Sequence, residues 1–549
     1  MLIKQEFQNL RLKVKKIIYR KVVKSGSSAS PVAKPAQNQI LPEESLAEKN
    51  TQSTENNLGN LHEDLHFNIF NKLNHQALGN CIIVSKQFSK TIKECLPLNR
   101  KVQDIQFSYD ILQRLQNDKD DYVRKAVAEA CGNIEDNKLT SAILQSLKED
   151  KNLYVKACVA ESCGKIGDKA WTCAILERLQ NDTDDYVRKA VAKACGNIGN
   201  NDLTRTILQR LQNDTSNGVR KAVAEACGKI GDKAWTCAIL ERLQNDTNPY
   251  VKECVANACG NIGDNNSTRD ILQSLKDDTY EFVRKAVADA CGNIGDNNST
   301  HDILQSLKDD TDSYVRIAVA KACGRIGNKA WTRDILDFLK NDTYYVRIAV
   351  AVACGNIGDN EWPPAILNIL KDDAIWMVRR TVAEACGNIG DNNWTGAILE
   401  SLQNDTNLYV KACVAEACGN IGDKAWTRDI LEGLQNDTNL YVKACVAEAC
   451  GNIGDKTWTR DILQSLKKDT NEYVRRVVAE ACGNIGDNNW TGAILDFLKN
   501  DPDDYVRKTV AKACGRIGDK AWTRDILKGL KKDKDDLVKI YVVEALLKN

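Results

Sequence analysis

The amino-acid sequence predicts an all-α fold, a solenoid of about thirteen stacked helical hairpins, and two observations predict it. Cys-Gly pairs recur every 32 residues from Cys131 to Cys514, with a single step of 31 residues before Cys354. Within each unit, apolar residues return at the i, i+3, i+4, i+7 spacing of an amphipathic helix. A fixed period of this length is typical of arrays in which each unit buries its apolar face against its neighbours.

The first kind of helix is illustrated by the stretch YVRKAVAEACGNI. Its Val123, Val127 and Cys131 fall on one helical stripe, which predicts a helix with one buried face. A glycine four positions after the cysteine, such as Gly167, predicts a left-handed helix stop. The first unit has Glu135 at this position instead, an irregularity that suits an end unit.

The second kind of helix is illustrated by WTRDILEGLQ, in which Trp426, Ile430 and Leu434 form the apolar face. One unit has two prolines after its tryptophan, beginning at Pro363, and proline is tolerated in the first turn of a helix. We therefore expect this helix to begin just after the tryptophan, with a threonine such as Thr427 as its N-cap.

Together these residues resemble the HEAT repeat. An Asp, then Val-Arg or Val-Lys, an Ala-rich helix, Gly-x-Ile-Gly-Asp and Ile-Leu-x-x-Leu are similar to the short HEAT-like class named for phycobilin lyases. The resemblance covers residues 107–532 as thirteen repeats, with residues 533–549 as a C-terminal capping helix. It implies a right-handed α-solenoid with one helix layer outside and one layer lining a concave face.

Composition narrows the class of protein. Lys plus Arg is 76 and Asp plus Glu is 75, and this balance argues against a dedicated nucleic-acid binder. Of the 21 cysteines, thirteen recur as Cys-Gly inside apolar helical patterns and no CxxC pair occurs, so we interpret the cysteines as core residues of a cytoplasmic protein and not as metal ligands. No distinctive acid, base or cofactor-binding cluster is found, and we expect neither catalysis nor a cofactor.

Basic residues recur after the Val of each unit, with an Asp six residues earlier in nearly every copy. They could follow a phosphate backbone, but the HEAT resemblance implies that the Asp and Arg positions link neighbouring repeats by charge-assisted hydrogen bonds. We call this set the Asp–Arg ladder; its first members include Asp118, Arg124, Asp182, Arg188, Asp214 and Arg220.

A tyrosine recurs before the same Val, at the expected start of a helix, and this column includes Tyr345 of the 31-residue unit. Packing accounts for such a column, but aromatic side chains are also favoured anchors in protein interfaces. We expect the following residues to be candidates for binding a target protein: Tyr122, Tyr154, Tyr186, Tyr250, Tyr314, Tyr409, Tyr441, Tyr473 and Tyr505.

Two segments lie outside the repeat. Residues 1–24 hold eight cations against Glu6, a net of +7, with apolar residues on one helical stripe. This pattern predicts a basic amphipathic helix that contacts an anionic membrane, targets the protein or docks on a partner, or else a solvated tail. Residues 25–60 are rich in Ser, Pro, Asn, Gln and Glu, which predicts a disordered linker.

Residues 61–100 occur once, and helical spacing predicts three short helices. The segment resembles an F-box, most specifically at Val84-Ser85-Lys86-x-Phe88, but His62 and Ala77 depart from the Pro and Asp of that pattern. The resemblance implies docking on a Skp-type adaptor through the following residues: Leu61, Leu65, Ile69, Phe70, Leu73, Leu78, Val84 and Phe88. A helical cap that closes the end of the array is the alternative.

The two resemblances together imply a non-catalytic substrate receptor of a cullin-RING ubiquitin ligase. The solenoid would hold a target protein and the F-box-like segment would connect it to the ligase, in the cytoplasm or in a host cytosol. A HEAT-repeat scaffold without a ubiquitin link is the first alternative, and an enzyme of the phycobilin-lyase type is the second.

Overall fold

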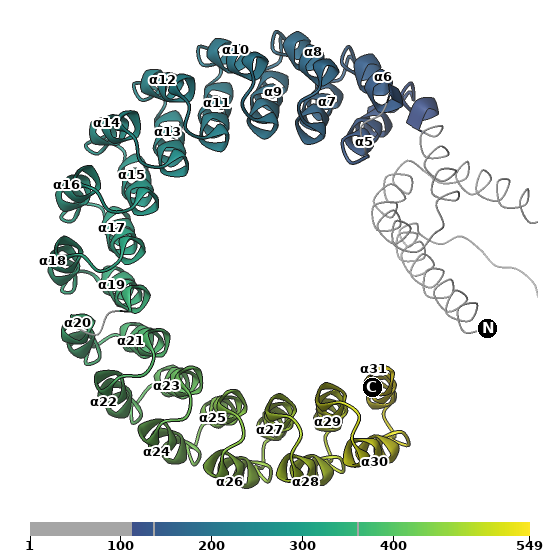
Figure 1. Ribbon diagram of the computed structural model, residues 1–549, viewed down its shortest axis with the longest axis vertical. Helices are drawn as coiled ribbons and strands as arrows, with labels where there is room; N and C mark the ends of the chain where they lie inside the picture. Colours follow the sequence, from purple (N-terminus) through teal and green to yellow (C-terminus); the bar gives the residue numbers. More distant parts are fainter. Residues whose placement is uncertain (1–111, 135–137, 359–361, 549) are drawn as a thin grey trace, which may run out of the picture. The chain divides into compact units, whose positions relative to one another are not determined.

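The computed structural model describes residues 112–134, 138–358 and 362–548. The chain divides into two compact units, and all the described residues belong to the second, Asn74–Asn549. Every regular element within them is a helix, and consecutive helices pack as antiparallel neighbours (Figure 1). The predicted all-α solenoid is therefore confirmed.

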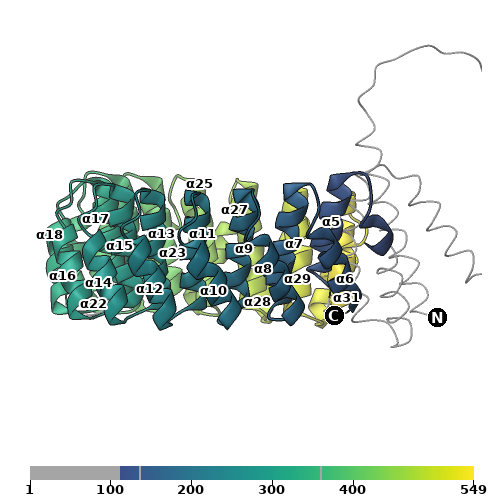
Figure 2. The same cartoon turned by 90° about the horizontal axis from the view of Figure 1, so that it is seen from above.

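The helices form two layers. Odd-numbered helices line the inner side of the curve and even-numbered helices form its outer side (Figure 1). Seen from above, the helices of both layers lie across the direction of stacking (Figure 2). Helices α5 to α30 make thirteen consecutive pairs, and α31 packs against α29 and α30.

The inner helices have the following bounds: α5 (Asp121–Cys131), α7 (Leu153–Ile166), α9 (Asp185–Ile198), α11 (Asn217–Ile230), α13 (Pro249–Ile262), α15 (Glu281–Ile294), α17 (Ser313–Ile326), α19 (Tyr344–Ile357), α21 (Trp376–Ile389), α23 (Leu408–Ile421), α25 (Leu440–Ile453), α27 (Glu472–Ile485), α29 (Asp504–Ile517) and α31 (Asp536–Lys548).

The outer helices have the following bounds: α6 (Lys138–Leu147), α8 (Ala170–Leu179), α10 (Asp202–Leu211), α12 (Ala234–Leu243), α14 (Asn266–Leu275), α16 (Asn298–Leu307), α18 (Ala330–Leu339), α20 (Pro363–Leu370), α22 (Asn393–Leu402), α24 (Ala425–Leu434), α26 (Thr457–Leu466), α28 (Asn489–Leu498) and α30 (Ala521–Leu530).

Small residues set the close packing of the inner layer. A Cβ added at Gly451 would lie 2.8 Å from the Cα of Ala481 on the next inner helix, and Gly196 stands in the same relation to Ala226, at 2.9 Å. Inner helices therefore contact one another along much of their length, whereas outer helices, which carry Ile, Leu and Trp, touch their neighbours less. Tight packing inside and wider spacing outside produce the curvature.

The core lies between the two layers. Val187, Val191 and Cys195 of α9 are fully buried, as are Ile207 and Leu208 of α10, and their counterparts recur through the array. The 19 described cysteines are free thiols, and all but Cys173 are buried. They fill small spaces between helices, as the sequence pattern predicts.

The inner helices begin and end with the same capping interactions in most repeats. At the start of α9 the carboxylate of Asp184 accepts the backbone N–H of Tyr186, at 2.8 Å. At its end Gly199 has φ +92° and ψ −157°, a region open almost exclusively to glycine. The predicted glycine stops are present, but this conformation is not the expected left-handed helical one, which only Gly358 adopts among the described glycines with positive φ.

The predicted start of the outer helices is wrong in most repeats. Helix α24 begins at Ala425, before the tryptophan, and Thr427 is its third residue instead of its N-cap. The buried hydroxyl of Thr427 accepts the Lys424 N–H at 3.0 Å and lies 2.8 Å from the Gly422 carbonyl oxygen. Helix α20 alone follows the prediction, because Pro363 cannot donate a backbone hydrogen bond and occupies the first turn.

Candidate functional site

The Asp–Arg ladder connects each inner helix to the loop before the next one. Arg188 of α9 donates from Nε and Nη2 to the carboxylate of Asp214, at 2.6 and 2.9 Å. Its Nη1 donates to the backbone oxygen of Asp182 in its own repeat, at 2.8 Å. Arg124 makes the same contacts with Asp150 and with the backbone of Asp118.

At Asp214, one of the ladder carboxylates, the pKa is lowered. Partial burial pushes the pKa of Asp214 upward, but hydrogen bonds from Arg188 and from the Ser216 backbone, with the charges of Arg188 and Arg220, outweigh burial and lower the pKa below 3.8. Arg220 forms the next step of the ladder by donating to Asp246. These guanidinium groups are engaged within the protein, which leaves them poorly placed to bind a phosphate backbone.

The predicted tyrosines lie at the N-terminal ends of the inner helices. Because the helices of this layer run in the same direction, the tyrosines form a row along one side of the inner face. Seven members have exposed rings, with exposed fractions from 46% at Tyr186 to 78% at Tyr122. Tyr441 and Tyr473 are half-buried against the core.

Neighbouring rings of this row touch one another. Tyr154 and Tyr186 make an edge contact with ring centroids 5.5 Å apart. Tyr409 lies between Trp376, at 5.3 Å, and Tyr441, at 6.2 Å. We call this set the aromatic row; its described members are Tyr122, Tyr154, Tyr186, Tyr250, Phe282, Tyr314, Tyr345, Trp376, Tyr409, Tyr441, Tyr473 and Tyr505.

Two members of the row, Phe282 and Trp376, were not in the tyrosine column that the sequence predicts, whereas Tyr345 was. Phe282 occupies the tyrosine position of its repeat and stacks on Tyr250 at 5.0 Å, so aromatic class was the signal that would have found it. Tyr345 belongs to the 31-residue unit and is 57% exposed. Trp376 is displaced by one position along the helix, and only the structure places it beside Tyr409.

The inner face below the aromatic row carries charged and apolar side chains. A shallow hollow of about 160 Å³ between α5, α7 and α9 is lined by Tyr154, Tyr186, Glu161 and Lys165, among others. The rings and the charged residues one to three turns further along the helices therefore share one surface. On α19 this surface also has an apolar residue, Val352, which is 38% exposed and lies two turns beyond Tyr345.

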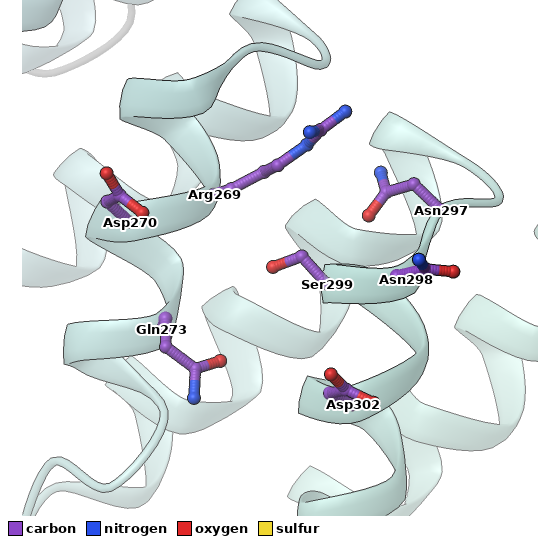
Figure 3. Close-up of a pocket in the computed structure, with 7 residues that line it drawn as sticks. All are labelled: Arg269, Asp270, Gln273, Asn297, Asn298, Ser299 and Asp302. Atoms are coloured by element: carbon purple, nitrogen blue, oxygen red, sulfur yellow. The ribbon is translucent and has the colours of Figure 1, made fainter.

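A larger cleft, of about 540 Å³, lies on the outer face between α14 and α16 (Figure 3). Polar side chains line both sides: Arg269, Asp270, Gln273, Asn297, Asn298, Ser299 and Asp302. Arg269 already forms an ion pair with Asp264, at 2.5 Å.

A missing tryptophan explains this cleft. In the next repeat Trp331 covers His301, with ring centroids 5.0 Å apart, and donates to Asp296. Trp426 covers Gly396 in the same way. Ser299 occupies the tryptophan position in α16, so the space beside Arg269 stays open, and we interpret the cleft as a packing gap.

The described residues give little support for a reactive cysteine or a metal site. Burial raises the pKa of the Cys227 thiol to about 12, and burial likewise dominates the shift at Cys291. The described part of the chain holds no group of three His, Cys, Asp or Glu side chains arranged for a metal ion. Within the same residues, no helix combines the length and apolarity needed to cross a bilayer.

The predicted adaptor-binding residues lie outside the described residues. This applies to Leu61, Leu65, Ile69, Phe70, Leu73, Leu78, Val84 and Phe88, and also to the segments 1–24 and 25–60. Their roles stay predictions.

Comparison with known proteins supports the repeat assignment. A family model described as HEAT repeats matches residues 110–178, 172–243, 236–322, 300–385, 363–449, 427–491 and 459–547. A comparison with curated proteins gave no match.

Among solved structures, Kap121p bound to Ste12p superposes with a TM-score of 0.50 at 14% identity, over 80% of this chain and 55% of that one. Kap121p bound to Pho4p gives a TM-score of 0.50 at 15% identity, over 79% and 55%. This chain thus spans about half the length of these proteins, and at this identity the likeness concerns the fold.

Proposed function

Because this chain belongs to the HEAT-repeat family, we propose that it is a protein-interaction scaffold that binds a partner protein along its inner face. The observation that carries the proposal is the aromatic row, most of whose members are exposed on the inner helices. Exposed tyrosine rings place apolar surface in contact with water, which is unfavourable in the free protein. A partner that covers the rings removes this surface from water, and this contributes to binding.

The row has the properties of an interface anchor. Tyrosine offers a large contact area with few rotatable bonds and a hydroxyl that hydrogen-bonds, so little entropy is lost when it is covered. The contacts between Tyr409, Trp376 and Tyr441 hold the rings in place before binding. Kap121p, which shares the fold, is solved with Ste12p and with Pho4p bound, and we carry the capacity for protein ligands over to this chain as part of the proposal.

Site-specific photo-crosslinking tests the proposal. A photoreactive phenylalanine analogue would replace Tyr314 or Tyr409 on the inner face, and Phe338 on the outer helix α18 as the control, since its side chain is 51% exposed. We expect crosslinks to a partner protein from the two inner positions and none to the same partner from Phe338. Equal crosslinking from both faces would contradict the proposal.

A second candidate adds a link to ubiquitin ligation. The sequence Val84-Ser85-Lys86-x-Phe88, at the F-box spacing from Leu65, favours a cytoplasmic receptor that docks on a Skp-type adaptor of a cullin complex. A pull-down with purified adaptor compares the intact chain with the double variant Leu65→Asp plus Phe70→Asp. Retention of the adaptor by the intact chain alone supports this candidate. If neither chain retains the adaptor, the ubiquitin link is rejected and the scaffold function stands by itself.

A further inference from the structure

The inner face of α23 and α25 presents the same surface twice. The two helices are identical in sequence, LYVKACVAEACGNI, and lie one repeat apart. Each carries one aromatic-row member, Tyr409 or Tyr441, and one exposed glutamate two turns further on, Glu416 or Glu448. Two equivalent carboxylates therefore stand side by side beneath two touching rings.

These carboxylates lack the cations that accompany glutamates elsewhere on the inner face. Many repeats have Lys or Arg one turn before the carboxylate position, such as Lys285, which pairs with Asp289 at 3.3 Å. Ala412 and Ala444 occupy that position in α23 and α25 and are buried.

The one lysine on each of these two helices is engaged. Lys411 and Lys443 belong to the Asp–Arg ladder and pair with Asp437 and Asp469. Among the ion pairs of the described residues, none involves Glu416 or Glu448, whereas Glu480 of α27 lies 3.7 Å from Arg516.

The electrostatics agree with an uncompensated site. Partial desolvation and, after it, the negative charges of Glu416 and Glu480 raise the pKa of Glu448. The carboxylate of Glu416 accepts a weak hydrogen bond from the Cys445 thiol at 3.6 Å, which holds it between the two helices. A cation brought by a partner would relieve this repulsion.

We propose that the inner face of α23 and α25 binds an extended segment of a partner protein through two lysine or arginine side chains, one for each of Glu416 and Glu448. This inference rests on the proposed scaffold function and names the chemistry of its partner. The alkyl stems of the two cations would lie on the rings of Tyr409 and Tyr441 while their charged ends reach the carboxylates. Arg476 shows that a cationic side chain can lie on a ring of this row, since its guanidinium lies 4.8 Å from the centre of the Tyr473 ring.

The distance between neighbouring inner helices sets the distance between the two cations of the partner segment. Neighbouring packed helices lie about 8–10 Å apart. In a polyproline-II segment, residues three positions apart point to the same side and are separated by about 9 Å. The partner segment therefore carries its two cations three residues apart.

Fluorescence anisotropy with synthetic peptides tests this inference. The probe is a labelled peptide of about twelve residues with lysine at every third position and Ser and Pro between. A second peptide of the same composition has its lysines contiguous, and a third has Gln in place of Lys. We expect the spaced peptide to bind most tightly and the neutral peptide not to bind.

The protein variants separate the site from general charge. Glu416→Gln plus Glu448→Gln should weaken binding of the spaced peptide by about tenfold or more, and high salt should weaken binding to the unaltered chain. The control, Glu400→Gln plus Glu432→Gln on the outer helices of the same region, removes the same charge and should leave affinity unchanged.

Equal affinity in the two double variants, or no binding of any peptide by the unaltered chain, would overturn the inference. Equal binding of the spaced and contiguous peptides would overturn the three-residue spacing. If no peptide binds the unaltered chain while the photo-crosslinks from Tyr314 and Tyr409 to a partner protein are still observed, the scaffold proposal stands and this inference falls.

Discussion

Arg220 donates from Nε and Nη2 to the two carboxylate oxygens of Asp246, at 2.5 and 2.9 Å, and so joins two repeats across 26 positions of sequence. Its Nη1 also donates to the backbone oxygen of Asp214, at 2.7 Å. The side chains of Arg220 and Asp246 are mostly buried, with 17% and 6% of their surface exposed. One guanidinium group thus satisfies acceptors from two successive loops.

Replacing Arg220 by Ala should therefore destabilise the array locally. The change leaves Asp246 partly buried without its cation, and we expect a loss of about 1.5–3 kcal/mol. Hydrogen exchange across α11 and α13 would measure the loss, because unfolding of a repeat array is not confined to two states. The matched control is Arg178→Ala, whose pair with Glu149 has side chains exposed at 64% and 55%, so that its removal should cost much less than the loss of Arg220. Equal losses at both positions would contradict the role given to the ladder.

Stability should fall in acid because of the same carboxylates. In Asp246, burial raises the pKa, but the hydrogen bonds from Arg220 and the Asn248 backbone, with the charges of Arg220 and Lys252, lower it below 3.8 overall. Asp310 and Asp405 show the same direction. A pKa that is lower in the folded state gives stability that is complete above the unfolded value and is lost as pH falls through the folded value.

We therefore expect a constant melting temperature from neutral pH down to about pH 5 and a steep decline below about pH 4. Differential scanning fluorimetry across this range would measure it. The variant Asp246→Asn should be less stable at pH 7 and show a shallower acid decline, and an unchanged acid profile would count against this origin.

Gly451 should not tolerate a methyl group. A Cβ there would lie 2.8 Å from the Cα of Ala481, a backbone atom that cannot move aside alone. We expect Gly451→Ala to cost about 1–3 kcal/mol through separation of α25 and α27. Gly529→Ala is the matched control, because its nearest neighbour is the Lys499 side chain at 3.9 Å, and it should stabilise α30 by up to about 1 kcal/mol. Urea denaturation of the two variants would separate these opposite signs.

Ser299→Trp should fill the cleft between α14 and α16. By analogy with Trp331, the indole would cover Arg269 and its N–H would face Asp264, so we expect a gain of about 1 kcal/mol. The reverse change, Trp331→Ser, should open a second cleft and cost about 2 kcal/mol or more. Thermal melts would decide, and a loss on Ser299→Trp would show that the cleft is not a tryptophan-shaped gap.

The aromatic row shows how much of a candidate binding site can be predicted from the sequence. Nine tyrosines were predicted from one column of the repeat, and their column position was sufficient because identical helices repeat identical environments. The column did not include Trp376, which reaches the row from the preceding position on its helix and meets Tyr409 across the repeat boundary. It also did not separate Tyr441, which is half-buried, from Tyr314, which is 66% exposed. These differences arise from contacts between neighbouring helices, and the residue pattern along one helix does not predict such contacts.

The outer helices show a second limit. Trp426 and Thr427 were predicted to lie at the start of a helix, and they do, but the helix begins one residue before the tryptophan. The threonine hydroxyl hydrogen-bonds back to the loop from within the first turn, and the partly buried Gly422 carbonyl that it contacts is fixed by the preceding inner helix. Local propensity alone favours threonine as an N-cap, and the loop geometry reverses that preference.

The sequence by itself determined the architecture of the described residues, because a 32-residue period of amphipathic helices can bury its apolar faces only by stacking. It also determined which residues form the core and which glycines end the inner helices. Only the tertiary structure decided that the Ala-, Gly- and Cys-rich helices line the inner face, since it places Gly451 against the backbone of Ala481. That choice puts Tyr409, Tyr441, Glu416 and Glu448 on one surface, and their shared surface depends on contacts between helices that no single repeat contains.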